Sequence, residues 1–449
     1  MDDLMVVILA AGKGTRMQSR YNKMIHKLAG RPLIDHVIEG ALDLSDKVVC
    51  VVGHQARQVK GSITRCEAVE FVQQDEQKGT AHAVWQAEDY ISSHRGQCLI
   101  LYGDTPLIRQ ETLMKMIDIH RKREAGMTML TSRLDDPTGY GRIVRDEEGE
   151  IREVVEEHDA DEDKASIKEI NAGIYCYESE LLLKSLGLVD NDNAQDEYYL
   201  PETIAHIKEV KPLASCRAEP DEIIGINDRQ DLARAENILQ ERIRSLHMKN
   251  GVTLIDPERI YIEKDVEIAS DVTIYPGTVI RAGSIIGPEC YIGPNCQLDQ
   301  ARLGREVEVK QGSFIIASQI GDEVKVGPYA HLRPGNEVGK GAKIGNFVEL
   351  KKSSIGEESK VPHLSYVGDG SMGRGCNIGA GTIFANYDGE NKHRTELGDE
   401  VFIGSNTTLV APVKLGDGAS TGAGSVVTDD VEERSVVLGV PARFHKKKR

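Results

Sequence analysis

The sequence predicts an α/β domain, then a long helix, then a three-sided parallel β-helix. Three observations lead to this prediction. Short apolar runs alternate with amphipathic segments through the first half of the chain. A single helical pattern then covers residues 229–250, and from Ile262 onward an apolar residue returns every six positions. We therefore expect domains at residues 1–228 and 251–449, joined by the helix, and a chain of 449 residues is long enough for both cores.

The composition argues against nucleic-acid-binding, membrane-spanning and secreted classes of protein. The chain carries 55 Lys and Arg against 72 Asp and Glu, a formal net charge of −17 at pH 7, which argues against general binding to nucleic acid or to an anionic membrane. Its longest apolar runs are far too short to cross a bilayer. The opening MDD lacks the basic and apolar regions of a secretory signal. The eight cysteines include no CxxC pair, so we expect a cytoplasmic protein with reduced thiols and no zinc site.

The first half is expected to form a mostly parallel sheet. Four apolar runs, at residues 5–10, 47–53, 98–102 and 127–132, have the near-continuous Val, Ile and Leu content of buried strands. The segments between them place apolar residues at helical spacing. Strands that alternate with helices favour a parallel sheet covered on both faces, and ligands bind at the carboxyl ends of such strands.

The second half is expected to form a solenoid behind the helix. Asp228 can cap the helix and Gly251 can end it. Ile262 and Ile268 then begin the six-residue series, which fits neither an α-helix nor a hairpin sheet. It fits a three-sided coil of about 18 residues, stacked in about ten turns. The one long interruption, residues 384–396, predicts a loop that projects from the stack and carries binding function.

Glycines and charge point to a phosphate site in the first half. The first apolar run leads into AGKGTRM, where Gly12 and Gly14 let backbone N–H groups approach phosphate oxygens. Six basic residues and no acidic one lie between Leu4 and Ile34, which suits a polyphosphate; a solvated basic surface is the alternative. Asp104 follows a buried run and can hold Mg²⁺ against phosphate oxygens, although an Asp at a turn has the same spacing.

Several motifs then appear in a fixed order: LAAGKGTRM, NKMIHKLAGRPL, QDEQKGTAHA, LYGDTPL, TGYGRIV, EINAGIY and GIND. Together they resemble the sugar-1-phosphate nucleotidylyltransferases. With the helix and the hexapeptide series, nearly the whole chain resembles the bacterial bifunctional N-acetylglucosamine-1-phosphate uridylyltransferase/glucosamine-1-phosphate acetyltransferase family. The resemblance implies a Rossmann-like nucleotidylyltransferase domain, the linker helix and a left-handed parallel β-helix of hexapeptide repeats.

The resemblance also implies a reaction sequence. Glucosamine 1-phosphate is acetylated with acetyl-CoA, and UMP is then transferred from UTP with Mg²⁺ to give UDP-N-acetylglucosamine and pyrophosphate, a product that feeds peptidoglycan synthesis. Members are homotrimers with the acetyl-CoA site between subunits. No covalent nucleophile is expected, because phosphoryl transfer of this kind needs positioning and charge neutralisation.

For the uridylyl site the resemblance implies roles by motif. Arg16 and Lys23 would be catalytic and neutralise the triphosphate, and Asp104 and Asn227 would bind Mg²⁺. Asn22 stands where many members have Pro before the motif lysine, which predicts a less rigid loop. Substrate would be bound by the set Leu9, Ala10, Ala11, Gly12, Lys23, Gln74, Gly79, Thr80, Tyr102, Gly103, Asp104, Gly141, Glu156, Asn171 and Asn227.

For the acetyl site the resemblance makes His363 the general base, although a lone histidine is more often a simple surface residue. The pKa of an ordinary His, near 6.5, suits removal of a proton from an amine. Glu349 would orient His363 or contact the amine. The acceptor would be bound by Arg333, Lys351, Tyr366, Asn377, Asn386 and Tyr387, and acetyl-CoA by Ala380, Ser405, Ala423 and Arg443. Lys446 to Lys448 could also meet a CoA phosphate, or form a frayed basic tail.

Two alternatives remain from the residues. One is a monofunctional sugar-1-phosphate nucleotidylyltransferase with a regulatory or trimerising β-helix; His363 with Arg333 and Lys351 argues against it. The other is a noncatalytic assembly subunit, against which the intact Arg16 and Asp104 argue.

Overall fold

The computed structural model describes residues 3–193 and 195–447 and divides into two compact units, Met1–Leu239 and Gln240–Arg449. The division falls inside helix α9 (Arg229–Lys249). Lys448, part of the basic tail considered above, lies outside the described residues. No helix of the described chain is both long and apolar enough to cross a membrane.

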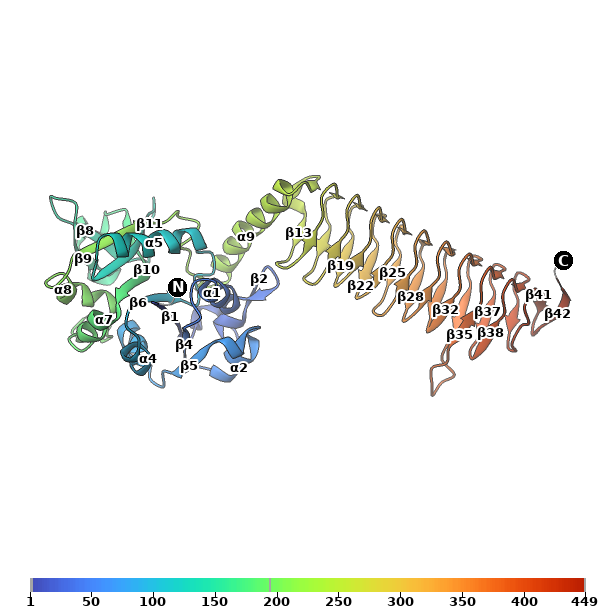
Figure 1. Cartoon of the computed structure of the whole chain (residues 1–449), viewed down its shortest axis with the longest axis horizontal. Coiled ribbons are helices and arrows are strands. Elements are labelled where there is room, and N and C mark those ends of the chain that lie inside the picture. The colour runs from blue at the N-terminus through green and yellow to red at the C-terminus, as the bar shows by residue number, and fades with distance from the viewer. Residues whose placement is uncertain (1–2, 194, 448–449) are drawn as a thin grey trace. The chain divides into compact units, whose positions relative to one another are not determined.

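The N-terminal unit is built on one mixed sheet in the order β11-β7-β10-β6-β1-β4-β5 (Figure 1). Strand β1 pairs in parallel with β4 and β6, as expected, but β10 is antiparallel to both of its neighbours. Along this seven-strand order the expected mostly parallel sheet therefore contains one reversed strand, and β9, attached through β8, runs in the same direction as β10. The strands are β1 (Leu4–Ala10), β4 (Val48–Val52), β5 (Glu70–Gln73), β6 (Gln97–Tyr102), β7 (Met127–Arg133), β10 (Glu169–Glu178) and β11 (Leu213–Arg217), with β8 (Arg142–Arg145) and β9 (Ile151–Val155) attached to β10 and the separate hairpin β2 (Lys27–Leu28) and β3 (Arg31–Pro32).

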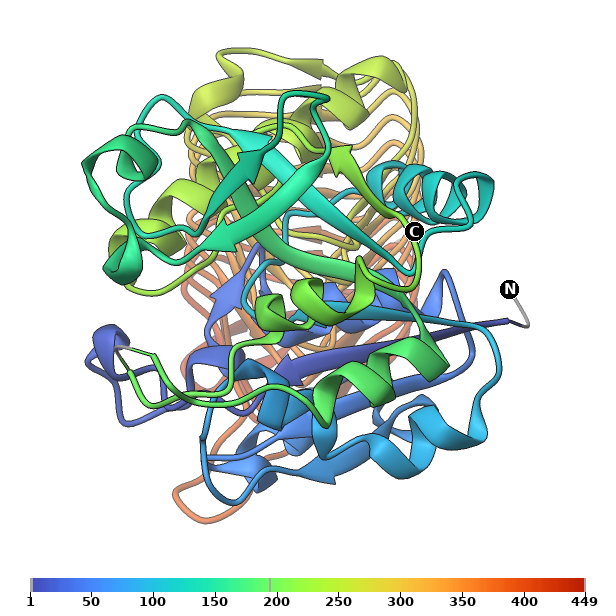
Figure 2. The same ribbon diagram turned by 90° about the vertical axis from the view of Figure 1, so that its left-hand side faces the viewer.

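Helices cover both faces of this sheet, as predicted. Alternate residues of β1 belong to different cores: Val6 and Ile8 pack in one cluster, Val7 and Leu9 in the other. Such alternation is what a strand buried on both faces requires. Figure 2 looks onto this unit, with its strands and surrounding helices in front. The helices are α1 (Leu33–Leu42), α2 (Ala56–Ser62), α3 (Thr80–Trp85), α4 (Glu88–Ser93), α5 (Gln110–Lys122), α6 (Glu162–Ala165), α7 (Ser179–Leu186) and α8 (Thr203–Ile207).

The C-terminal unit is a parallel β-helix whose coils stack in three sheets (Figure 1). The first sheet holds β12 (Thr253–Leu254), β15 (Thr273–Ile274), β18 (Tyr291–Ile292), β21 (Glu308–Val309), β24 (Lys325–Val326), β27 (Lys343–Asn346), β30 (Lys360–His363), β33 (Asn377–Ile378), β36 (Phe402–Ile403), β39 (Ser420–Thr421), β41 (Ser435–Gly439) and β42 (Ala442–Lys447). The second holds β13 (Tyr261–Ile262), β16 (Val279–Ile280), β19 (Gln297–Asp299), β22 (Phe314–Ile316), β25 (His331–Leu332), β28 (Glu349–Lys351), β31 (Tyr366–Gly368), β34 (Ile383–Ala385), β37 (Thr408–Val410) and β40 (Val426–Val427). The third holds β14 (Glu267–Ile268), β17 (Ile285–Ile286), β20 (Arg302–Leu303), β23 (Gln319–Ile320), β26 (Glu337–Val338), β29 (Ser354–Ile355), β32 (Gly370–Met372), β35 (Thr395–Leu397) and β38 (Val413–Leu415).

The six-residue series forms the core of this β-helix. Ile262, Ile280 and Leu298 stack in successive coils of the second sheet, and each is fully buried. The predicted interruption leaves the stack between β34 and β35 as a short hairpin closed by a bridge between Tyr387 and Lys392, and Figure 1 shows it projecting from the coils.

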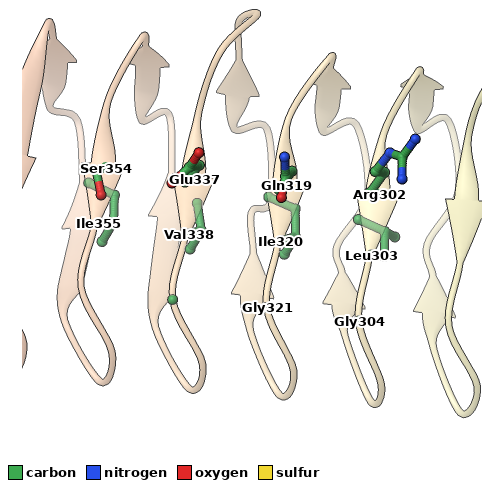
Figure 3. A pocket seen from close by; sticks show the side chains of 11 residues that line it. Arg302, Leu303, Gly304, Gln319, Ile320, Gly321, Glu337, Val338, Ser354 and Ile355 are labelled. Carbon is green, nitrogen blue, oxygen red and sulfur yellow. The ribbon is translucent and has the colours of Figure 1, made fainter.

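The third sheet has an open groove of about 400 Å³ beside a column of glycines that includes Gly304, Gly321 and Gly339. Figure 3 shows Arg302, Gln319, Glu337 and Ser354 along it, one from each successive coil. None of the predicted site residues is among the described residues that line this groove.

Candidate active sites

The first candidate site is a cavity of about 440 Å³ at the carboxyl ends of β1, β5 and β6. This is where an open α/β sheet binds ligands. Eleven of the predicted uridylyl-site residues line it: Leu9, Ala11, Gly12, Arg16, Lys23, Gln74, Gly79, Thr80, Tyr102, Asp104 and Asn227.

Inside this cavity two cationic side chains each contact a side-chain oxygen. Lys23 Nζ lies 2.5 Å from Asp104 Oδ2, and Arg16 Nη2 donates to Asn227 Oδ1 at 2.9 Å. Lys23 is nearly buried, with 8% of its surface exposed, so its charge acts where water screens it poorly. The cavity can therefore hold a polyphosphate with its cations and a divalent metal with its oxygens.

The donor set fits Mg²⁺. A carboxylate and an amide oxygen are hard ligands, and Mg²⁺ in proteins keeps several waters and substrate phosphate oxygens besides one or two protein groups. Among the described residues, no group of three or more His, Cys, Asp or Glu is arranged to hold a metal. The two oxygens thus suit an ion that arrives with the nucleotide.

Two glycines of the cavity are required by geometry. Gly14 has φ +60°, and a Cβ there would lie 2.6 Å from Lys23 Cβ. Gly79 has φ +108°, and a Cβ there would lie 2.5 Å from the Tyr198 carbonyl oxygen. Any side chain at either position would displace a wall of the cavity.

The loop before Lys23 is fixed by Asn22, contrary to the expected loss of rigidity. Asn22 is 1% exposed; its Oδ1 accepts from Met24 N at 2.9 Å, and its Nδ2 donates to the His54 carbonyl at 2.7 Å. The side chain therefore caps the turn that carries the lysine and ties it to the turn that follows β4. Hydrogen bonds replace the restraint that a proline ring would supply.

The remaining predicted residues of this unit surround the cavity without lining it. Ala10 and Gly103 are packed together beneath it, and the side chain of Ala10 is 1% exposed. Gly141 lies beside Glu156 and accepts from Asn171 N at 2.8 Å through its carbonyl. Burial raises the pKa of Glu156. Gly14, expected from the sequence to approach phosphate oxygens, also lines the cavity. Five further lining residues were not expected: Thr15, Met24, Gln77, Ala83 and Glu197.

The second candidate site lies on the outer surface of the second sheet of the β-helix. Glu349 pairs with Tyr366 across β28 and β31, and Lys351 pairs with Gly368. A Cβ on Gly368 would lie 2.4 Å from Tyr366 Oη and 2.8 Å from Asn386 Nδ2. The glycine therefore makes room for a hydroxyl and an amide that approach from adjacent coils.

The projecting hairpin adds a cation that the sequence analysis missed. The contact of Lys392 with Lys351 lowers the pKa of Lys392, while Asp369 and Tyr366 act in the opposite direction. Asn386 Nδ2 donates to Asp369 Oδ2. Two facing lysines favour an anion between them, as the phosphate of a sugar phosphate would provide. The signal was available in the sequence, because Lys392 belongs to the interruption already expected to carry binding function.

His363 is held by a residue of the preceding coil. Its Nδ1 lies 2.5 Å from Asn346 Oδ1, across β27 and β30. Because the amide oxygen only accepts, Nδ1 carries the proton and Nε2 keeps a lone pair. Glu349, expected to orient His363, instead forms an ion pair with Arg333 at 3.0 Å. The orienting residue is thus an asparagine that sequence reasoning did not single out.

The predicted acetyl-CoA residues follow His363 up one edge of the β-helix. Successive coils are linked by Gly381 N to the His363 carbonyl at 3.4 Å, Asn406 N to the Ala380 carbonyl at 2.7 Å and Gly424 N to the Ser405 carbonyl at 2.8 Å. Ala423 N lies next to Gly404, directly before Ser405. We call His363, Ala380, Ser405 and Ala423 the edge column. Its small side chains leave the backbone accessible along its length.

Three other predicted residues of this unit lie in the first sheet or on the projecting hairpin. Asn377 pairs with Lys360 in the same sheet as His363, and Tyr387 is exposed on the hairpin. Arg443 lies in β42 and pairs with Leu438, which packs on Gly422 beside Ala423. The tail is therefore a hairpin strand as far as Lys447, and not a frayed end.

These observations define the class of the protein: a transferase with a nucleotide site in an α/β unit and an acyl-acceptor site on a hexapeptide β-helix. Residues 5–220 match the family model described as nucleotidyl transferase. Residues 265–300, 317–352 and 394–429 match the model described as bacterial transferase hexapeptide (six repeats).

Curated relatives share nearly the whole chain. The "Bifunctional protein GlmU" of Listeria welshimeri is 45% identical over 95% of this chain and 93% of its own length. Proteins of the same name from Shouchella clausii and Acetivibrio thermocellus are 43% and 45% identical, over 99% and 98% of this chain and 98% and 95% of their own lengths. The chain belongs to the GlmU family. The prediction of a bifunctional enzyme of UDP-N-acetylglucosamine synthesis is thereby confirmed.

Proposed function

We propose that the C-terminal unit acetylates glucosamine 1-phosphate with acetyl-CoA, and that the N-terminal unit then transfers UMP from UTP to the product with Mg²⁺, releasing pyrophosphate. The observation that supports the proposal is that each unit holds its own set of polar groups suited to one of the two reactions. Lys23, Asp104, Arg16 and Asn227 share one cavity, while His363 heads the edge column in the other unit.

In uridylyl transfer the chain supplies position and charge. Lys23 and Arg16 would exchange their present oxygen partners for the triphosphate, which frees Asp104 and Asn227 to hold Mg²⁺. The metal, when bound, neutralises charge on the phosphates. The N-acetylglucosamine 1-phosphate oxygen then attacks the α-phosphorus, and cations fixed in a poorly solvated cavity stabilise the charge that develops on pyrophosphate.

In acetyl transfer His363 acts as the general base. Nε2 takes a proton from the amine of glucosamine 1-phosphate, while Asn346 keeps the Nδ1 proton in place and stabilises the imidazolium. Lys351, Lys392 and Tyr366 would hold the sugar phosphate. The amine would then attack the thioester carbonyl, and donors around Ser405 would stabilise the oxyanion. The C–S bond breaks as the amide forms, and CoA leaves as the thiol with the proton that His363 has taken.

We further propose a cytoplasmic homotrimer. Tyr329, Phe347 and Leu364 occupy one corner of three successive coils and are 50%, 57% and 60% exposed; we call them the corner stripe. The rings of Tyr329 and Phe347 stack with centroids 5.5 Å apart. An exposed apolar stripe on a three-sided rod suits packing around a threefold axis, and it adjoins His363. The eight cysteines, all free thiols, suit a reducing compartment.

The test follows pyrophosphate and free thiol together. The purified chain is incubated with glucosamine 1-phosphate, UTP and Mg²⁺, with and without acetyl-CoA. We expect thiol release and pyrophosphate formation that depends on acetyl-CoA. His363→Ala should abolish thiol release yet retain pyrophosphate formation when N-acetylglucosamine 1-phosphate is supplied, and Asp104→Ala should do the reverse. Pyrophosphate at full rate from glucosamine 1-phosphate alone, without thiol, would contradict the proposal.

A further inference from the structure

The amide of Gln74 lies at the nucleotide cavity in one defined orientation. Gln74 is 3% exposed and lines the cavity. Its Nε2 lies 2.9 Å from His82 Nδ1 and donates to the Gly79 carbonyl at 3.4 Å. A main-chain carbonyl can only accept, so the NH₂ group of the amide must face it. Both amide hydrogens are thereby directed at acceptors of the protein itself.

This orientation requires His82 to accept through Nδ1. An amide nitrogen has hydrogens and no lone pair to offer, so Nδ1 must be unprotonated and the ring proton must be on Nε2. The contact of Nε2 with Gln86 Nε2 is longer, at 3.3 Å, and the Gln86 amide donates instead to the main-chain carbonyl of His82 at 3.1 Å, so the closer contact at Nδ1 decides where the ring proton lies. Burial and then the charge of Lys78 lower the pKa of His82, against a smaller opposing effect of Glu76, which favours the neutral ring.

The carbonyl oxygen of Gln74 is then the group left for a ligand. Within the described residues Gln74 Oε1 has no hydrogen-bond donor, and the side chain lines the cavity wall. An acceptor at this point pairs with an N–H on the edge of a base. Uracil carries a hydrogen on N3, whereas cytosine has a lone pair at N3, so an acceptor favours uracil and repels cytosine.

We propose that His82 is a positioning residue that sets base specificity: through Nδ1 it fixes the amide of Gln74 so that Oε1 faces the nucleobase and selects uracil over cytosine. The inference rests on the proposed function, because it assigns the nucleotide of the uridylyl reaction to this cavity. His82 itself is not among the described residues that line the nucleotide cavity. It lies on α3 and faces a separate apolar pocket with Trp85, Leu186 and Val189 on its other side.

Two variants of nearly the same shape separate positioning from packing. His82→Asn places an acceptor where Nδ1 stands, and His82→Leu keeps the branched shape without an acceptor. Gln86→Leu is the matched control, since it alters the contact at Nε2 and leaves Nδ1 unchanged. The full chain is assayed for pyrophosphate release with N-acetylglucosamine 1-phosphate and either UTP or CTP, and the ratio of the two kcat/KM values is the readout.

We expect His82→Leu to lower the UTP-to-CTP ratio by about tenfold or more, because Gln74 is then free to turn its NH₂ group toward the base. His82→Asn and Gln86→Leu should retain the ratio of the unmodified protein. Thermal unfolding followed by circular dichroism reports whether the N-terminal unit of each variant is folded, because acetyl transfer belongs to the other unit.

Two outcomes would overturn the inference. One is a His82→Leu protein that loses rate but keeps its UTP-to-CTP ratio, which would make His82 a packing residue only. The other is a His82→Asn protein as unselective as His82→Leu. Failure of the unmodified protein to use UTP at all would instead contradict the proposed function, so the two failures are distinguishable.

Discussion

Lys23 and Asp104 form an ion pair in the wall of the nucleotide cavity, with Nζ 2.5 Å from Oδ2 and with 9% and 19% of their side-chain surfaces exposed. The proposed metal ligand is therefore neutralised by the proposed phosphate ligand while the cavity is free of substrate. When UTP and Mg²⁺ bind together, Lys23 would pair with a phosphate and Asp104 with the metal. The ion pair within the protein would then be replaced by two interactions with ligands. Partly buried charges rarely stay unpaired, so each residue needs the other when no substrate is present.

We predict that Asp104→Asn lowers the rate of uridylyl transfer by about 100-fold, the usual effect of losing one group that stabilises transition-state charge. The Mg²⁺ concentration needed for half-maximal rate should also rise. Initial rates of pyrophosphate release across a Mg²⁺ titration measure both effects. Acetyl transfer is the internal control and should not change. An unchanged rate at low Mg²⁺ would remove Asp104 from the site.

The contact between Asn346 and His363 predicts a positioning effect in the other unit. Asn346→Leu should lower kcat for acetyl transfer by about tenfold, because one hydrogen bond that fixes the ring is lost, while KM for glucosamine 1-phosphate changes little. Thiol release at saturating acetyl-CoA measures this split. Gln319→Leu, on the third sheet, is a matched exposed control. A rise in KM at constant kcat would instead make Asn346 a substrate ligand.

The lowered pKa of Lys392 predicts that the sugar phosphate binds more weakly at alkaline pH. Because Lys351 lowers its pKa, Lys392 should lose its proton at a lower pH than an ordinary lysine, and affinity for the sugar phosphate should fall as pH rises through that pKa. Inhibition of acetyl transfer by N-acetylglucosamine 1-phosphate, which has no titrating amine, reports this affinity. Lys392→Ala should bind the inhibitor more weakly at neutral pH and lose most of the pH dependence. A variant with the same pH dependence would assign it to another group.

The proposed role of the corner stripe predicts that a charged substitution within it disrupts both trimer formation and acetyl transfer. Phe347→Lys places a charge among exposed apolar side chains that we propose to be buried between subunits. We expect a smaller species in sedimentation velocity and loss of acetyl transfer, with uridylyl transfer retained. Leu188→Lys, at an equally exposed leucine of the N-terminal unit, is the control. A trimer that survives Phe347→Lys would place the interface elsewhere.

The β-helix was predictable because its sequence period is set by its geometry. Each coil must turn three corners and bury one apolar side chain per face, so Ile262, Ile280 and Leu298 are separated by whole coils. The sheet of the other unit was less predictable. Strand β10 is antiparallel to its neighbours, and composition does not encode strand direction.

Site residues that belong to a sequence motif could be predicted one by one. The residues that contact them from other parts of the chain could not be predicted. Asp104 and Asn227 were expected from local motifs. Asn346 became visible only when the coils were stacked, because it precedes His363 by one coil and has no motif of its own. The same holds for His82, which stands in the QDEQKGTAHA motif but whose relation to Gln74 depends on how the turn after β5 meets α3.

The hairpin between β34 and β35 has a consequence for how the acceptor specificity of such enzymes can evolve. Backbone pairing continues across it without a break, from Met372 to Leu397 in one sheet and from Phe384 to Leu409 in another. Its residues Asn386, Tyr387 and Lys392, which we propose to contact the acceptor, do not belong to the stacked core. The hairpin can therefore be replaced without disturbing the β-helix. Specificity for a new acyl acceptor can evolve, or be engineered, by exchanging this one segment while the strand pairing between coils stays the same.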